Sequence, residues 1–259
     1  MNTPLLARVA ALLLSLAGPA IAADVPRGMP AASFVPPFTW TGCYLGGHLG
    51  GGWAQKDMID PVQLVQDSFL GFGSTAGVTT VKTTPTGVVI GGQIGCDYQF
   101  APSWVIGIEG AASGSTTKGS TSVPLPLGNP GDTAQVDTRT DFLPSVTTRF
   151  GYAFDRVLFY AKGGAAFAGD KYTVTGIFAG AGFGFEGLEE RTGWTAGAGV
   201  DWAFARHWSA SLEYDYYQFG HGTVLMSDSI NGFSGPVDVK QSVQVLKAGI
   251  NFHMWWSGW

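Results

Sequence analysis

Apolar and polar residues alternate with a period of two over long stretches of this chain. Residues 86–115 show the pattern most clearly, as two arms joined by a turn at residues 101–103. One parity of the first arm is apolar and consists of Val88, Ile90, Ile94, Cys96, Tyr98 and Phe100. In the second arm Trp104, Ile106 and Ile108 share a face, and Glu109 lies on the other. Alternation of this kind predicts β-strands and not helices.

The two faces of these strands differ in an informative way. One face is apolar and ends in aromatic residues, whereas the other carries small residues and isolated charges. A soluble sheet buries its apolar face, but a membrane barrel turns that face toward lipid and closes around a polar interior. The same pattern predicts eight strands, at residues 43–55, 86–100, 104–115, 139–154, 157–172, 189–204, 208–219 and 240–254.

The connections between these strands alternate between long and short. Long polar loops are expected at 56–85, 116–137, 173–188 and 220–239, and short turns at 101–103, 155–156 and 205–207. Outer-membrane barrels have an even number of strands, long extracellular loops and short periplasmic turns. We therefore predict an all-β protein, an eight-stranded antiparallel transmembrane up-and-down barrel with both termini in the periplasm. The first loop is expected to hold a short helix at 62–69, and the last an Asn231-Gly232 hairpin turn.

Aromatic residues gather beside the predicted short turns. They are Tyr98, Phe100, Trp104, Tyr152, Phe154, Trp202, Phe204 and Trp208. Rings of this kind form girdles at the membrane–water interfaces of such barrels, so we expect an inner aromatic girdle here. Composition agrees, because charged residues make up only 13% of the chain and Gly is abundant at 39 residues. A net charge of −5 does not favour nucleic-acid binding.

The N-terminus has the features of an exported protein. Arg8 precedes the apolar run 9–17, and Ala20-Ile21-Ala22 forms a cleavage site. We therefore predict a cleaved signal peptide at 1–22; the alternative is a retained helical anchor, for which the run is short. Residues 23–37 are expected to form a Pro-rich leader, and 38–259 the barrel domain.

Two cysteines, Cys43 and Cys96, lie on the apolar parity of strands that are expected to be neighbours. Export permits oxidation, so a cross-strand disulfide is one interpretation. Two thiols acting as small hydrophobic residues are the other. Strand register decides between them, and the sequence does not determine the register.

Charged residues also fall on the inward parity of the predicted strands. They are Asp97, Glu109, Arg149, Lys162, Asp201, Glu213, Asp215 and Lys247. Charges in a narrow lumen must pair or contact water, and eight strands leave an interior only wide enough for side chains. Two hypotheses remain open: a structural plug of paired side chains, or a thin ion-conducting path gated by those pairs.

Other motifs are weaker candidates for a site. His207, Ser209 and Glu213 share the inward parity, which allows a lipid-modifying hydrolase with Ser as nucleophile and His as base. The G-x-G-x-x-G match at 182–187 is a chance one, because a dinucleotide site needs a strand before it and a helix after it. We expect exposed phenylalanines at Phe178, Phe183 and Phe185 to contact a partner or lipid headgroups. The histidines are not spaced as metal ligands, and we expect no catalytic residues, no metal and no cofactor.

Three segments carry a resemblance to a known family: WTGCYLGG at 40–47, VVIGGQIGCDYQF at 88–100 and KAGINFHM at 247–254. They resemble the small porin-family outer-membrane β-barrel proteins of alphaproteobacteria, the major surface antigens of rhizobial-type Gram-negative bacteria, with OmpA-like eight-stranded barrels. The resemblance implies an outer-membrane location, a role at the cell envelope or surface, and in some members pore or ligand-binding activity. It also implies contact with outer-membrane lipid, lipopolysaccharide and the barrel-assembly machinery. One departure is that Met254 stands where such barrels end on an aromatic residue, and WWSGW follows at 255–259.

Overall fold

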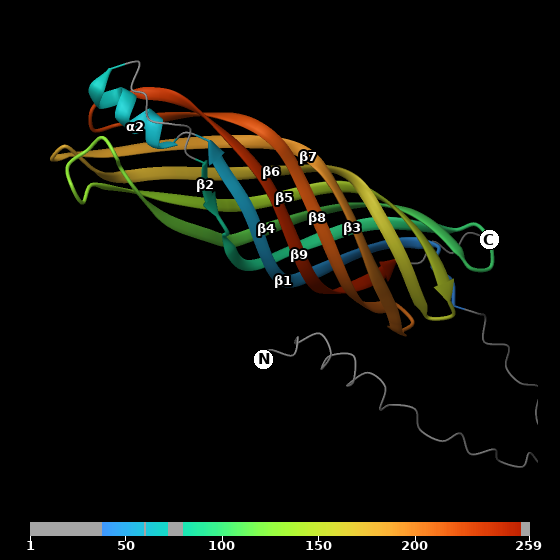
Figure 1. The fold of residues 1–259 in the computed structure, drawn as a ribbon. Helices are drawn as coiled ribbons and strands as arrows, with labels where there is room; N and C mark the ends of the chain where they lie inside the picture. Colours follow the sequence, from blue (N-terminus) through green and yellow to red (C-terminus); the bar gives the residue numbers. More distant parts are fainter. Residues whose placement is uncertain (1–37, 60, 72–79, 255–259) are drawn as a thin grey trace, which may run out of the picture. The chain divides into compact units, whose positions relative to one another are not determined.

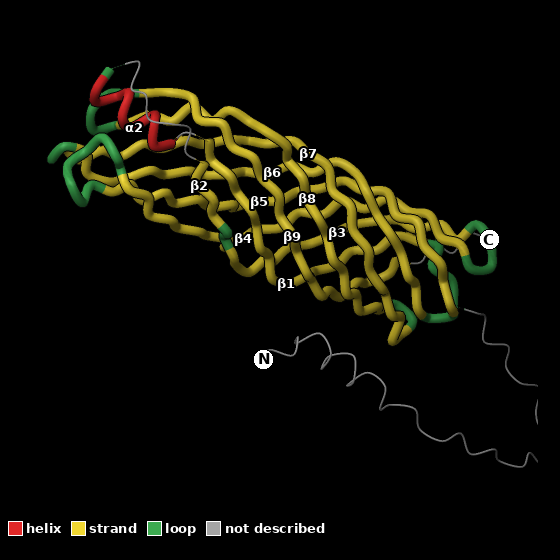
Figure 2. The backbone as a smooth tube through the Cα atoms, viewed as in Figure 1, coloured by secondary structure: helices red, strands yellow, loops and turns green. Residues whose placement is uncertain are grey.

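A computed structural model describes residues 38–59, 61–71 and 80–254, which form one closed antiparallel sheet. The strands are β1 Gly42–Ile59, β2 Thr80–Thr83, β3 Thr86–Gln99, β4 Trp104–Pro124, β5 Thr133–Phe154, β6 Val157–Phe178, β7 Ala181–Ala205, β8 Trp208–Asp228 and β9 Ser234–Met254. Strands that follow one another from β3 to β9 are neighbours, and β1 pairs with both β3 and β9, which closes the ring (Figure 1, Figure 2). The predicted eight-stranded barrel is therefore confirmed. The predicted signal peptide 1–22, the predicted leader 23–37 and the final residues 255–259 lie outside the described residues.

The short strand β2 is a continuation of β3. β2 pairs with Lys56–Ile59 of β1, and β3 pairs with Gly42–Trp53 of the same strand. The interruption falls at Pro85, which has no N–H to donate to the ladder. Its carbonyl still accepts a hydrogen bond from the N–H of Ala54 at 2.8 Å, so the two pieces together act as one of the eight barrel strands.

The two ends of the barrel differ. One end carries the connections 100–103, 155–156 and 206–207, and we call it the turn end. The other carries α2 (Pro61–Leu70) and the tips of the long hairpins, and we call it the helix end (Figure 1). No helix in the described part of the chain is long and apolar enough to cross a membrane.

The outer wall near the turn end is apolar. Ile90, Phe159 and Ile250 are more than half exposed, as the alternation predicted. All eight aromatic residues of the predicted girdle are exposed as well, and Trp104 stacks on Phe150 with ring centroids 5.1 Å apart. The apolar parity therefore faces outward over this part of the barrel, and the predicted orientation is confirmed.

Three of the predicted long loops are wrong as loops. Residues 116–137, 173–188 and 220–239 are mostly strand, and the chain reverses at 125–132, 179–180 and 229–233. The predicted helix and the Asn231-Gly232 turn are confirmed, with α2 at Pro61–Leu70 and Gly232 at a φ of 75°. The strands in these three segments were not predicted because the alternation continues beyond the lipid-facing wall with the apolar residues on the inward face.

The exchange of faces is clear in the predicted loop 173–188. Phe178, Phe183 and Phe185, expected to be exposed, are instead 1%, 2% and 0% exposed. Beyond the lipid-facing wall the barrel is surrounded by water, so most outward side chains are polar, with exceptions such as Leu188 and Leu225, and the lumen contains most of the apolar ones. The interior of the helix end is consequently a hydrophobic core that includes Tyr172 and Val174. α2 covers this core with Val62 and Val65.

The lumen contains two further apolar layers. The middle layer includes Val89, Leu143 and Tyr217. The layer at the turn end includes Trp40 and Leu158. Polar and charged side chains lie on the inward faces of the same strands, and they form the candidate site.

Candidate functional site: the charged lumen

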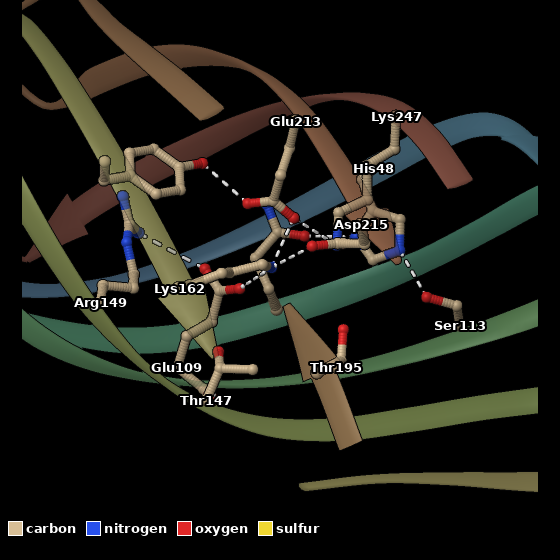
Figure 3. A network of polar contacts seen from close by, with 12 residues as sticks. His48, Glu109, Ser113, Thr147, Arg149, Lys162, Thr195, Glu213, Asp215 and Lys247 are labelled. Atoms are coloured by element: carbon tan, nitrogen blue, oxygen red, sulfur yellow. Dashed lines mark hydrogen bonds and ion pairs between the residues drawn. The ribbon is translucent and has the colours of Figure 1, made fainter. Parts of the chain in front are cut away.

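The structure places all eight predicted inward charges in the lumen. They come from β3 (Asp97), β4 (Glu109), β5 (Arg149), β6 (Lys162), β7 (Asp201), β8 (Glu213, Asp215) and β9 (Lys247), and each is at most 6% exposed. Figure 3 shows most of them converging from opposite walls of the barrel. Inward parity explains why they share a face, and the closed ring explains why acids and bases from distant strands meet.

Arg149 is the centre of one half of this network. Its Nη2 lies 2.8 Å from Oδ2 of Asp201, and its Nη1 lies 3.4 Å from Oε2 of Glu109. Nη1 also donates to the hydroxyl of Tyr44. The guanidinium lies over the ring of Tyr160, 3.9 Å from its centroid. A planar guanidinium with several donors is suited to hold two carboxylates and an aromatic face at once.

Two lysines hold the other half. Lys162 Nζ lies 2.9 Å from Oε1 of Glu109 and 2.5 Å from Oε1 of Glu213. Lys247 Nζ lies 2.7 Å from the same Glu213 oxygen and 2.9 Å from Oδ2 of Asp215. Glu109 therefore contacts both halves, and the eight charges form one continuous network.

The charges in this network do not balance. Five carboxylates face three cations, which leaves two excess negative charges if all are ionised. Tyrosine hydroxyls supply some of the missing donors, since Tyr44 donates to Glu109 at 2.6 Å and Tyr160 donates to Glu213 at 2.7 Å. Asp97 has weaker contacts than the other carboxylates. Its Oδ2 lies 3.8 Å from Nη1 of Arg149, and neither of its carboxylate oxygens has a hydrogen-bond partner. Within the described ranges no group of His, Cys, Asp or Glu is arranged to hold a metal.

A neutral polar cluster, which the sequence interpretation missed, lies beside the charges. His48 Nε2 lies 2.8 Å from Ser113 Oγ (Figure 3). Its Nδ1 contacts the side chain of Gln93. Gln93 in turn donates to Oδ1 of Asn251 at 2.7 Å. Each of these side chains has a partner, as buried polar groups require, so the cluster fills the lumen without adding charge.

A second buried ion pair, also missed, lies toward the helix end. Lys56 Nζ is 2.7 Å from Oδ1 of Asp170, and both side chains are 0% exposed. Thr140 donates to the same oxygen at 2.5 Å, and Lys56 lies over the ring of Tyr172 at 4.9 Å. The sequence interpretation assigns Lys56 to a loop. Lys56 is an even number of residues from Tyr44, so the alternation places both side chains on the inward face. This shared parity could have identified Lys56 from the sequence.

The predicted hydrolase group is not brought together. Ser209 Oγ lies 2.9 Å from Nε2 of His253 and not against His207. His207 instead contacts the backbone carbonyl of His253, and Glu213 is bound by the two lysines. Ser209 is 0% exposed. The sequence interpretation chose the wrong histidine because His253 comes from the final strand, which only closure of the barrel places beside β8.

The cysteine pair and the glycine motif form no binding or catalytic site in the structure. The structure joins Cys43 and Cys96 by a disulfide bond, and the two residues are directly opposite on β1 and β3. The glycine motif at 182–187 lies within β7 and is followed by more strand, which is not the setting of a dinucleotide site.

Asp228 organises the turn between β8 and β9. Asn231 donates to its Oδ2 at 2.7 Å, and the backbone N–H of Ile230 donates to its Oδ1 at 2.8 Å. The N–H of Gly184 on the neighbouring strand reaches Oδ1 at 3.3 Å. Burial alone raises the pKa of Asp228, but these hydrogen bonds to the carboxylate outweigh burial, so the pKa lies below its ordinary value.

A closed antiparallel barrel with an apolar outer wall, an aromatic girdle and charged residues inside is an integral protein of the bacterial outer membrane. The chain belongs to the family described as "Outer membrane protein beta-barrel domain", which matches residues 9–252. Short turns of such barrels face the periplasm, so the turn end is periplasmic and the helix end is extracellular.

Relatives support the same conclusion. The chain is 29% identical to the 31 kDa outer-membrane immunogenic protein of Brucella melitensis, over 97% of this chain and 99% of that protein. It is 27% identical to the 25 kDa outer-membrane immunogenic protein of Brucella abortus, over 94% of this chain and 95% of that protein. The resemblance to surface antigens of alphaproteobacteria is therefore confirmed. The crystal structure of the outer membrane protease OmpT from Escherichia coli matches with a TM-score of 0.51 at 9% identity, covering 85% of this chain and 99% of that one; this likeness concerns the fold alone.

Proposed function

We propose that this protein is a closed outer-membrane barrel with a structural and surface-exposed role. It contributes to the integrity of the envelope and presents its extracellular hairpins to the host or the environment. The observation that carries this proposal is the filling of the lumen from one end to the other. Eight strands leave an interior about wide enough for side chains, and here apolar and polar layers occupy it in turn.

The periplasmic mouth is the first closed layer. Trp40 is 1% exposed, and its indole N–H donates to the carbonyl of Asp155 at 3.3 Å. Its ring also contacts His253, with centroids 5.8 Å apart. An ion entering from the periplasm would meet this apolar layer before it reached the charged network, which makes steady conduction unfavourable.

The extracellular half closes the lumen again. The Lys56–Asp170 pair is 0% exposed, and the hydrophobic core beyond it includes Met58 and Phe185, each also 0% exposed. A buried ion pair next to an apolar core offers no continuous path of water. The lumen in this half therefore supports a plug that stiffens the barrel.

The extracellular hairpins are the proposed surface of contact. The relatives' names describe immunogenic proteins, and we carry that property to the hairpins of this chain because they extend past the membrane. We propose no catalytic activity. Outer-membrane lipid, lipopolysaccharide and the barrel-assembly machinery are the partners that such a barrel needs in order to insert and remain in the membrane.

Planar-bilayer conductance of the purified protein tests the proposal. We expect no steady current from the unmodified chain. A Trp40→Ala variant opens only the periplasmic layer, so it should conduct only if the deeper layers open as well. A steady open current from the unmodified protein, reduced by Arg149→Met or Lys162→Met, would overturn the closed barrel in favour of a pore.

A gated cation path is the second candidate, because one observation favours it. The network carries two excess carboxylates, and Asp97 has no hydrogen-bond partner although it is buried. Such a site attracts cations. Voltage-dependent openings with cation selectivity, abolished by Asp97→Asn, are the result that this candidate requires and the closed barrel forbids.

A lipid-modifying enzyme is tested separately. We expect outer-membrane lipid profiles to stay unchanged in Ser209→Ala, His207→Ala and His253→Ala variants, because Ser209 is buried and no substrate reaches it. A lipid species that disappears only in the Ser209 variant would establish the enzyme.

A further inference from the structure

Three cations stand side by side on the outer wall of the barrel. Lys118 of β4 is directly opposite Arg139 of β5, and Arg139 is directly opposite Lys171 of β6. Their side chains point outward, and that of Lys171, the least exposed of the three, is 42% exposed. Together with Ser120, Thr173 and one acid, Asp137, they line an open cavity of about 550 Å³, so three cations face a single carboxylate there. We call these three residues the cation row.

The cation row lies at the level of the outer-leaflet headgroups. Phe142 is an exposed apolar residue of β5, and Arg139 follows three positions nearer the helix end. A rise of about 3.3 Å per residue and a strand tilt of about 40° place Arg139 at most about 8 Å beyond the apolar wall. Headgroup layers extend roughly 5–8 Å on each side of the hydrocarbon, so the row faces them.

Like charges in this arrangement destabilise the sheet unless something neutralises them. Arg139 pairs with Asp141, and Lys171 Nζ lies 3.0 Å from Oε2 of Glu186, but all four of these side chains are at least 42% exposed. Exposed ion pairs are weak, because water and salt screen the charges. Lys118 forms no ion pair with any described residue. The row is therefore open to a stronger anionic ligand.

Other exposed cations of the extracellular half are arranged differently. Lys82 and Lys240 lie on either side of Asp57, each in direct register with it. Cation, anion and cation alternate there, so the strands partly neutralise one another. Acids also flank Arg139 along β5, at Asp137 and Asp141, but in the described part of the chain only across β4, β5 and β6 do these exposed cations lie directly opposite one another. Lys82 and Lys240 therefore supply a matched control.

We propose that the cation row binds the phosphate-bearing headgroup of a lipid of the outer leaflet. An arginine fork flanked by two lysines matches a phosphate group in charge and geometry, and the hydroxyls of Ser120 and Thr173 add donors at the cavity wall. The lipid's acyl chains then lie along the exposed apolar wall beneath Phe142. This inference rests on the outer-membrane location of the barrel and does not depend on whether the lumen is closed.

The test uses the full-length protein in a neutral detergent. Native mass spectrometry records binding of bisphosphorylated lipid A, with dephosphorylated lipid A, phosphatidylcholine and inorganic phosphate as the comparison ligands. We expect the triple variant K118A/R139A/K171A to bind lipid A at least tenfold more weakly. The control variant K82A/K240A should bind as the unmodified chain does, and added salt should weaken binding to the unmodified chain.

Several outcomes would overturn the proposal. Equal binding of lipid A by the unmodified chain and the triple variant is one, and equal binding of lipid A with and without its phosphates is another. Inorganic phosphate competing at the same concentration as lipid A would assign the row to a free anion. Gel mobility with and without boiling shows whether each variant is a folded barrel. If the triple variant does not fold, the single variant Lys118→Ala, which breaks no ion pair, carries the same expectation with a smaller decrease.

Discussion

Replacing Lys56 by methionine removes one partner of the buried ion pair in the extracellular half of the lumen. Asp170 then keeps its hydrogen bonds from Thr140 at 2.5 Å and from Gln241 at 3.4 Å, but loses the cation 2.7 Å away. Both partners are 0% exposed, so the carboxylate is left charged in a place that water does not reach. Breaking a buried pair in this way costs about 3–5 kcal/mol.

The reverse variant, Asp170→Leu, is expected to cost a similar amount, because it strands the Lys56 ammonium. The double variant K56M/D170L removes both charges and leaves apolar side chains next to a hydrophobic core. Replacing a whole buried pair by apolar groups is often neutral or stabilising. We therefore expect the double variant to lie within about 1 kcal/mol of the unmodified protein, with a coupling energy of several kcal/mol.

Urea unfolding of the barrel in lipid vesicles, followed by tryptophan fluorescence, measures these free energies. A loss of 3–5 kcal/mol corresponds to about a hundredfold to a few thousandfold change in the ratio of folded to unfolded protein. A loss of less than about 1 kcal/mol in each single variant would contradict the burial of this pair. Losses that simply add in the double variant would contradict it as well. Either result would mean that water reaches the pair and that residues past the membrane behave as loops.

Two further predictions concern local packing and pH. Gly95→Ala places a methyl group against the Tyr44 hydroxyl and should lower the free energy of unfolding by about 1–3 kcal/mol in the same urea assay. Gly51→Ala is the control and should be nearly neutral, because no atom lies within 4 Å of the added group. Equal effects of the two variants would contradict close packing at Gly95. Because hydrogen bonds lower the pKa of Asp228 in the folded state, its stabilising contribution is complete above its ordinary pKa of about 3.9 and is lost as the pH falls through the lowered value. Protection of the β8–β9 turn against hydrogen exchange, corrected for the intrinsic pH dependence of exchange, should therefore decrease below about pH 4. Asp228→Asn should remove that decrease.

The sequence shows the membrane part of this protein clearly. Ile90 and Phe159 alternate with small and charged residues, and the side chains of a strand necessarily alternate between two faces. The low charge content and the short turns then select a lipid-facing outer wall. For the same reason alternation alone assigns the eight lumen charges, Arg149 among them, to the interior.

The extracellular half is less predictable from the sequence. Phe178 and Phe185 also alternate with polar residues, but there the apolar parity faces inward because water surrounds the wall. A stretch rich in Gly, Thr and Ser conceals this change, so its strands resemble loops in the sequence. Lys56 is missed because it falls in a predicted loop. Asp170 lies within the predicted strand 157–172 and shares the inward parity of Lys162, but its partner could not be identified without the fold.

Alternation along the chain assigns the side chains of the membrane part to the lumen or to the outer wall, because successive residues of a strand point to opposite faces. Which side chains meet one another follows only from the folded barrel. Register and closure bring Arg149 to Asp201, place His253 and not His207 beside Ser209, and align three cations on the outer wall. Which residues contact each other across strands depends on the register of each strand relative to its neighbour. Alternation along a single strand carries no information about that register.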